Sequence, residues 1–237
     1  MTRLLLTCGL VGAALFVVTF LIDGATRPGY RPLYHPVSAL ALGSRGWVQT
    51  SNFVVTGVLM IAAAAGTREA LDVTIAPALL ALFGVGLVVS GVFTMDPMRG
   101  YPPGTEPGTP AVLSRRHKVH DIFGFVVFSS LAATVIAFAF ALEGGWKTYS
   151  FATAVVVIVL FVLFGVAWER DSPWMGLLQR LTILVGWTWN RPSVSVAPVA
   201  LNCRVWQHQR PPSRTPASRT SSTKLRMKKR GRTASRC

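Results

Sequence analysis

Two short clusters in this chain combine histidine with serine or aspartate, the residue types that bind metals and transfer protons. The first cluster holds His35 and Ser38, and the second holds His117, His120 and Asp121. Within the second cluster the spacings are three and four residues, so the side chains share one face if the segment is helical. These clusters are the first candidates for any chemistry that the protein performs.

Histidine and carboxylate groups brought together could ligate a divalent metal such as zinc, which takes three or four such ligands and activates water. The candidate metal ligands are His35, Asp96, His117 and His120. Ser38, beside a histidine and an aspartate, could instead support acyl transfer, with Ser38 and Asp121 as the candidate catalytic residues. Neither spacing is a motif by itself, so the residues leave open whether the protein is an enzyme.

The same polar groups could bind a small ligand or a lipid headgroup without catalysis. We expect the ligand-binding residues to be His35, Gln49, Asn52, Asp96, His120, Asp121 and Arg180. Glu169, Asp171 and Gln179 are expected at the same membrane level. A purely structural alternative is that His120 and Asp121 cap their helix and pair with Arg116 or Arg180, because interfacial polar residues often close a helical bundle.

Apolar runs close to the length of a membrane span separate these polar residues. A helix of about 20 apolar residues crosses roughly 30 Å of hydrocarbon, and in lipid its backbone groups must be satisfied within the helix. The runs predict helices near residues 4–22, 48–66, 75–94, 120–142, 149–168 and 176–189. The predicted fold class is therefore all-α, a polytopic transmembrane bundle of about six helices whose main partner is the lipid bilayer.

Composition and loop order agree with this fold. The chain is 51% hydrophobic and only 14% charged, as expected when lipid solvates the outer surface. The connections after the first, third and fifth runs must emerge on one face of the bundle. That face carries both histidine clusters, whereas the middles of the first five runs carry no charge, which argues against an ion pathway through the bundle.

The net charge of +15 is concentrated near the C-terminus. The 24 Lys and Arg residues divide equally between residues 1–189 and 190–237, and all 9 acidic residues lie in the first part. We therefore divide the chain into a transmembrane domain, 1–189, and a basic tail that is predicted to be disordered because it cannot bury a core. The tail could adhere to anionic lipid headgroups, and nucleic acid is not an expected partner. A shift of the reading frame after Trp189 explains its composition at least as well.

The expected location is the bacterial inner membrane, which the chain would cross several times. Basic residues in the loops favour a cytoplasmic histidine-bearing face, but counting the basic tail reverses this balance. We therefore predict that both the N-terminus and the C-terminus are cytoplasmic.

Five motifs follow one another in this chain: Tyr34 to Ser38, Gly43 to Phe53, Asp96 to Gly104, His117 to Asp121, and Gln179 with Arg180. In this order they resemble the domain-of-unknown-function 998 family of prokaryotic membrane proteins, over about residues 5–189. The resemblance implies six helices and no established activity.

A more distant likeness, at fold level, is to membrane hydrolases of the alkaline ceramidase and adiponectin-receptor kind, which assemble Ser, Asp and His residues around zinc. This likeness implies such parts for Ser38, His35, Asp96, His117 and His120. Our leading interpretation is an integral membrane protein with a polar pocket for a small ligand or lipid headgroup at one membrane face. The alternatives are a metal-dependent membrane hydrolase of lipid amides or esters, and a structural or assembly membrane protein.

Overall fold

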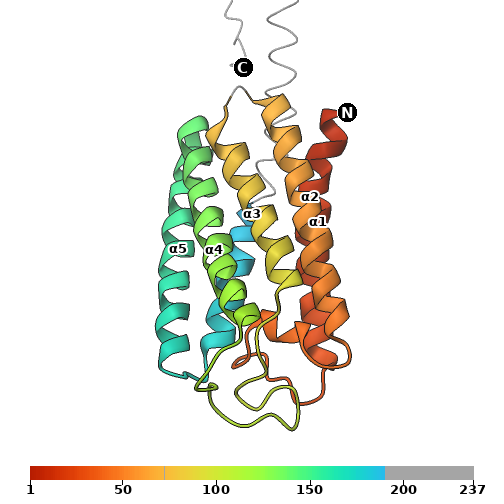
Figure 1. Ribbon diagram of the computed structural model, residues 1–237. Helices are drawn as coiled ribbons and strands as arrows, with labels where there is room; N and C mark the ends of the chain where they lie inside the picture. The colour runs from red at the N-terminus through yellow and green to blue at the C-terminus, as the bar shows by residue number, and fades with distance from the viewer. Residues whose placement is uncertain (72, 190–237) are drawn as a thin grey trace, which may run out of the picture.

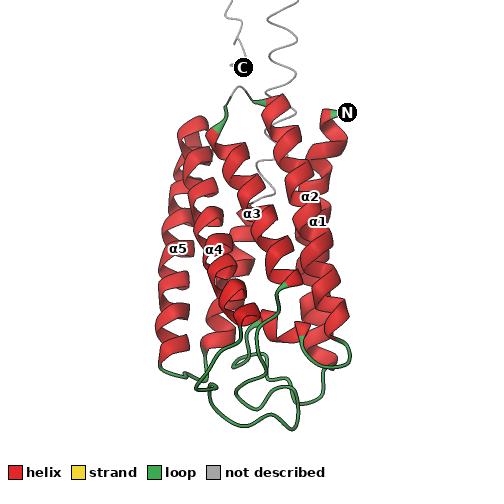
Figure 2. Cartoon of the chain, in the orientation of Figure 1, coloured by secondary structure: helices red, strands yellow, loops and turns green. Residues whose placement is uncertain are grey.

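The computed structural model describes residues 1–71 and 73–189, most of which form helices that run side by side (Figure 1). The named elements are α1 (Thr2–Thr26), the short 3-10 helix η1 (Val37–Ala41), α2 (Gly46–Ala70), α3 (Ile75–Val92), α4 (Arg115–Ala141) and α5 (Gly144–Glu169). Residues 175–189 form a last helical segment. Within this described part the structure has no strands, and the all-α prediction is confirmed (Figure 2). The predicted tail, 190–237, lies outside the described residues.

The helices α1 to α5 are long and apolar enough to cross a membrane. The helices α1, α2 and α5 extend past both ends of the apolar runs that predicted them, and α4 begins before its run. The reason is that polar residues continue these helices beyond the hydrocarbon. The start of α4 shows the cause, since the Ser114 hydroxyl caps the helix by accepting a hydrogen bond from His117 N at 3.1 Å. The second histidine cluster therefore occupies the first turns of α4.

The neighbours α2 and α3 approach closely through glycines. A Cβ atom on Gly57 would lie 2.5 Å from the Gly84 carbonyl oxygen, and one on Gly84 would lie 2.6 Å from the Gly57 carbonyl oxygen. Such contacts leave no room for any side chain, which is how small residues bring membrane helices together. The small residues of α3 thus serve helix packing.

The last helical segment, 175–189, is shorter than α1 to α5 and lies among the other helices, drawn in blue behind α3 and α4 in Figure 1. The Trp187 ring stacks on Phe16 of α1 at a centroid distance of 5.2 Å and meets Phe83 of α3 edge-on. At its end, Trp189 packs against Phe138 of α4 and donates from Nε1 to the Ser150 hydroxyl of α5 at 2.8 Å. Contacts with four helices therefore hold in place a segment that is short for a membrane-spanning helix.

The long loops gather at one end of the bundle, as the alternation of the runs predicts (Figure 1). An ion-pair cluster of buried Asp23 and Arg27 with the exposed Arg45, here called the Arg27 cluster, ties the first loop to α1. Arg27 Nε and Nη2 donate to the two Asp23 carboxylate oxygens at 3.0 and 2.9 Å, and Arg45 Nη2 donates to Asp23 Oδ1 at 2.7 Å. The guanidinium also donates to the carbonyls of Leu40 and Leu42. This places η1 against the end of α1.

Candidate functional site

An open groove with a volume of about 480 Å³ is bordered by α4 and α5 near the loop-bearing end of the bundle. Its volume lies in the range of roughly 300–1,000 Å³ that is typical of ligand pockets. Aromatic rings form much of its wall: Phe125, Phe128, Phe161, Phe164 and Trp168. These rings come from α4 and α5, which are both candidate membrane spans.

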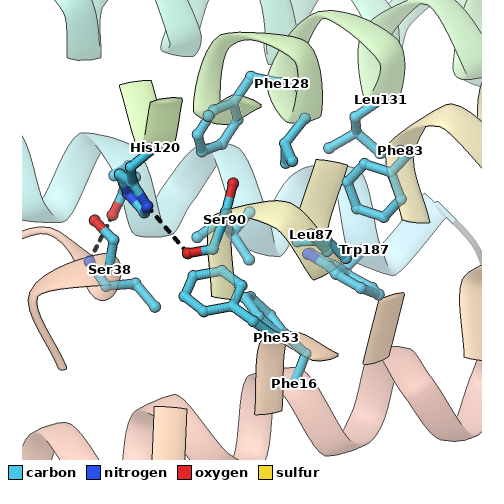
Figure 3. Close-up of a pocket in the computed structure, with 15 residues that line it drawn as sticks. Phe16, Ser38, Phe53, Phe83, Leu87, Ser90, His120, Phe128, Leu131 and Trp187 are labelled. Atoms are coloured by element: carbon cyan, nitrogen blue, oxygen red, sulfur yellow. Dashed lines mark hydrogen bonds between the residues drawn. The ribbon is translucent and has the colours of Figure 1, made fainter. Parts of the chain in front are cut away.

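A smaller cavity of about 60 Å³ lies deeper in the bundle, between Phe16, Phe83 and Trp187 (Figure 3). The groove and this inner cavity share five lining residues: Ser38, His120, Gly124, Phe128 and Gln179. Three of these are polar and come from three different elements. We call Ser38, His120 and Gln179 the polar junction, since they stand where the two spaces meet.

Among the described residues, His120 has hydrogen-bond partners only at the Nδ1 atom of its ring. Its Nδ1 lies 3.1 Å from the Ser90 carbonyl oxygen (Figure 3) and 2.8 Å from the Phe93 carbonyl oxygen, so Nδ1 carries the proton. In the neutral ring Nε2 is then an acceptor, and among the described residues it has no hydrogen-bond partner. His120 is 7% exposed and lines both the groove and the inner cavity. An acceptor without a partner therefore borders both spaces.

Gln179 and Ser38 also have unused polar atoms. The Val37 N–H, at the start of η1, has no acceptor within that helix and donates to Gln179 Oε1 at 2.6 Å. This bond fixes the orientation of the Gln179 amide, and the NH₂ group has no hydrogen-bond partner among the described residues. The Ser38 hydroxyl donates only to the weakly accepting Met95 sulfur, at 3.4 Å. Next to them the Ser90 hydroxyl lines the inner cavity, buried and without a partner. The polar atoms of the junction thus have unused bonding capacity.

His117, one turn before His120, is fully engaged. It is 1% exposed, its Nδ1 accepts from Asp96 N at 2.8 Å, and its Nε2 lies 3.1 Å from Asp121 Oδ2. The 3.9 Å approach of Nδ1 to Asp96 Oδ2 is not an ion pair, because an Nδ1 that accepts a hydrogen bond carries no proton. Burial tends to raise the pKa of Asp96, but two hydrogen bonds from Ser114 outweigh it and hold the pKa below its ordinary value.

His35 is likewise engaged on both sides. Its Nδ1 accepts from Arg31 N at 2.9 Å, its Nε2 donates to the Arg99 carbonyl oxygen at 3.2 Å, and its ring packs between Tyr30 and Tyr101. Burial, together with nearby arginine charges, lowers the pKa of His35 below its ordinary value. The residue therefore joins the first and third loops as a neutral ring.

Arg180 serves the first loop and does not face the groove. It donates to the Tyr30 hydroxyl and to the carbonyls of Pro32, His35 and Gly176. Burial raises the pKa of Tyr30 to about 12 although Arg180 opposes the shift, so the phenol stays protonated and donates to Pro36 O. The suggested pairing of His120 and Asp121 with an arginine is absent from the described residues, because the carbonyl groups and His117 occupy those positions.

Two predicted ligand-binding residues lie elsewhere. Gln49 and Asn52 are buried, with Asn52 Nδ2 donating to the Phe16 carbonyl oxygen of α1 at 3.2 Å and to Gln49 Oε1 at 3.3 Å. Neither lines the groove or the inner cavity. Of the predicted catalytic and ligand-binding residues, the structure brings Ser38, His120 and Asp121 together around the groove.

A metal centre is not assembled in the described part of the chain, where no three His, Cys, Asp or Glu side chains could hold an ion together. Both ring nitrogens of His35 and of His117 already have partners. Binding zinc there would require these bonds to break. The zinc site stays a prediction for which the described residues supply no ligand set.

Sequence reasoning grouped Gln179 with the other polar residues of this face but gave it no role, and it missed the Arg27 cluster. The i, i+4 spacing of Asp23 and Arg27 could have indicated that cluster. The aromatic wall was also missed, because phenylalanines on α4 and α5 are indistinguishable in sequence from rings that face lipid.

A family model described as a protein of unknown function, DUF998, matches residues 10–190. The chain belongs to this family. The match runs from within α1 through the last helical segment, so the groove and the polar junction lie within the region that defines DUF998. Neither a curated protein nor a solved structure matches the chain. With its several apolar helices, this DUF998 protein is a multi-pass membrane protein.

Proposed function

We propose that this DUF998 protein binds a small ligand or the polar end of a lipid-like molecule in the groove between α4 and α5, with the polar junction as the binding site. The observation that supports the proposal most strongly is the set of unused polar atoms on Ser38, His120 and Gln179 where the groove meets the inner cavity. No catalysis is part of the proposal.

Unpaired polar atoms are uncommon inside proteins because each one costs free energy when it is removed from water. In this protein both ring nitrogens of His35 and of His117, at the same end of the bundle, have partners, and both terminal nitrogens of Arg180 donate hydrogen bonds. The junction differs from them in bordering open space. A ligand that fills this space would supply the missing partners.

The aromatic wall gives the ligand its second property. Phe125, Phe161 and Trp168 come from two membrane-spanning helices and present apolar surface along the groove. A hydrocarbon chain packs favourably against such a wall, because burial of apolar surface contributes roughly 25 cal/mol per Å² to the binding free energy. The groove therefore favours an amphiphile that enters from the bilayer and points its polar end inward.

A photolabelling experiment tests the proposal on the full chain in lipid nanodiscs. The probe is a hexadecyl chain that carries a diazirine, and the labelled residues are mapped by mass spectrometry. Gly124→Leu and Gly165→Leu add side chains at two groove positions where a Cβ meets nothing within 4 Å, so they fill the groove without distorting the helices. Gly145→Leu is the matched control, equally unobstructed but outside the groove.

Labelling of the groove walls is expected in the unmodified protein and in Gly145→Leu, with a fall of at least about tenfold in the two groove-filling variants, equivalent to about 1.4 kcal/mol of binding. Equal labelling in all four proteins would overturn the proposal. Such a result would mean that the probe reads only the lipid-exposed surface of α4 and α5.

A further inference from the structure

Resting on the proposed function, we infer that the group entering the polar junction is uncharged and both donates and accepts hydrogen bonds, as a hydroxyl or a primary amide does. The junction excludes carboxylate and phosphate headgroups. The ligand class is therefore a long-chain alcohol, a long-chain amide or a lipid with a hydroxyl-bearing headgroup.

The first step is the pattern of unused atoms. His120 carries its proton on Nδ1, which lies near the carbonyls of Ser90 and Phe93, so the other ring nitrogen, Nε2, is an acceptor. The bond from Val37 N to Gln179 Oε1 leaves the Gln179 NH₂ as a donor. A single group that donates to one and accepts from the other satisfies both, and the Ser38 hydroxyl can adapt to either role.

The second step is charge. Among the described residues no lysine or arginine lines the groove or the inner cavity, whereas the carboxylates of Asp121 and Glu169 line the groove. An anionic headgroup would meet like charges with no cation to neutralise it. Buried or half-buried charges without a partner are strongly disfavoured.

Two buried arginines at this end of the bundle, Arg99 and Arg180, already have partners, although Arg99 Nε makes no hydrogen bond. Arg99 lies over the Trp168 ring at 4.0 Å, donates to the Trp168 carbonyl oxygen at 2.8 Å and contacts Asp171 at 3.3 Å. Arg180 donates hydrogen bonds to the Tyr30 hydroxyl and to the carbonyls of His35 and Gly176. Recruiting either one to an anion would break the contacts that hold the loops together.

A cationic amine also fits poorly, although the two carboxylates attract it. An ammonium group only donates, so it cannot accept from the Gln179 NH₂, whose direction is set by the bond to η1. The donor of Gln179 would then stay unpaired beside a positive charge. The junction thus selects neutral groups over both kinds of ion.

The test uses competition against the hexadecyl diazirine probe, again with the full chain in nanodiscs. The competitors share one chain and differ in the polar end: hexadecanol, hexadecanamide, ionised hexadecanoate, hexadecyl phosphate and hexadecylamine. We expect the alcohol and the amide to compete at least about tenfold more strongly than the three ions, a difference of about 1.4 kcal/mol. This comparison needs no variant, so it does not depend on how a substituted protein folds.

Two substitutions then assign the preference to particular atoms. His120→Asn keeps a donor near the position of Nδ1 and removes the Nε2 acceptor, and Gln179→Glu keeps the oxygen that accepts from Val37 N and replaces the NH₂ donor by an acceptor. His120→Asn should lose the preference for neutral competitors, while Gln179→Glu should shift it toward hexadecylamine. Gly145→Leu, outside the groove, should retain the order of the unmodified protein.

The outcomes separate this inference from the binding proposal. Groove labelling with equal competition by all five compounds, or strongest competition by an anion or by the amine in the unmodified protein, overturns the inference and leaves binding intact. Absence of groove labelling overturns the proposed function itself. An unchanged order of competitors in both junction variants would also overturn the inference, because the selectivity would then come from other residues.

Discussion

The Arg27 cluster and the polar junction lie at the same end of the bundle and use their polar atoms in opposite ways. In the Arg27 cluster, the Asp23 carboxylate is 2% exposed and receives three hydrogen bonds from two arginines. At the polar junction, His120, Gln179 and Ser38 each keep an atom without a strong partner. In the first region the charged groups pair with one another, and the second region lines the groove and the inner cavity.

The difference separates polar groups that are paired within the fold from polar groups that keep unused atoms. Burial alone does not distinguish the two regions, since Arg27 and His120 are 8% and 7% exposed. The balance of donors and acceptors does distinguish them. Burial tends to lower the pKa of Arg27, but the hydrogen bond and charge of Asp23, together with Tyr101, outweigh it and raise that pKa, so Arg27 stays charged.

The largest expected effect comes from breaking the Arg27 cluster. Arg27→Met leaves the buried Asp23 charge with Arg45 alone and removes the bonds to Leu40 O and Leu42 O. Loss of one partner from a buried ion pair costs about 3–5 kcal/mol. SDS titration of the detergent-solubilised protein measures the free energy of unfolding. Arg31→Met, an exposed arginine over the Tyr34 ring, is the control and should cost at most about 1 kcal/mol; equal losses would contradict the comparison.

The next effect separates two histidines one turn apart. His117→Leu leaves the Asp96 N–H without an acceptor and removes the contact with Asp121, so a loss of about 1–3 kcal/mol in unfolding free energy is expected. His120→Asn retains a donor toward Ser90 O and Phe93 O and should cost less than about 1 kcal/mol. If His120→Asn proved the more destabilising of the two, His120 would belong with the structural residues.

A smaller effect should appear in the pH dependence of stability. The pKa of His35 is lowered in the folded protein from its ordinary value of 6.5, so between these two values the unfolded chain binds a proton that the folded chain does not. Stability from His35 is thus complete above pH 6.5 and declines as the pH falls toward the folded pKa. The difference in unfolding free energy between the unmodified protein and His35→Gln should narrow over that interval. A difference that is constant with pH would show that His35 does not need to be neutral.

The smallest expected effect has the opposite sign. Ser90→Ala removes a buried hydroxyl that has no partner, so it should leave the stability unchanged or raise it by up to about 1 kcal/mol. Ser130→Ala is the matched control on α4, where the hydroxyl donates to Val126 O at 2.6 Å, and it should lower the stability by about 1 kcal/mol. Thermal unfolding in detergent compares the two. A loss on removing the Ser90 hydroxyl would mean that it has a partner in the folded state.

Much of the architecture was predictable because lipid restricts the choice of structure. The runs near 4–22 and 149–168 had to be helices, since hydrocarbon leaves no other partner for their backbone groups, and the structure has α1 and α5 there. The common face of His117 and Asp121 followed from helical spacing. The last helical segment was harder to judge, because its support comes from Phe16, Phe138 and Ser150, which lie far away in the sequence.

The candidate site was predictable only in part. The sequence placed His35, Ser38, Asp96, His117, His120, Asp121 and Arg180 at one membrane level, because alternating helices bring every second loop to the same face. It could not say that His35 joins two loops while His120 faces open space, since the two differ in which carbonyl or amide group lies beside each ring nitrogen. Those partners come from other helices and loops.

The sequence by itself determined the membrane-spanning class, the helical order and the face on which the polar residues collect, because periodicity and hydrophobic length are local properties of the chain. The tertiary structure decided which polar atoms are satisfied. Gln179 becomes a donor toward the groove only because its oxygen is bound by Val37 N, more than a hundred residues earlier in the chain. Hydrogen-bond satisfaction depends on distances of a few tenths of an ångström between distant segments, and these exist only after the helices have packed.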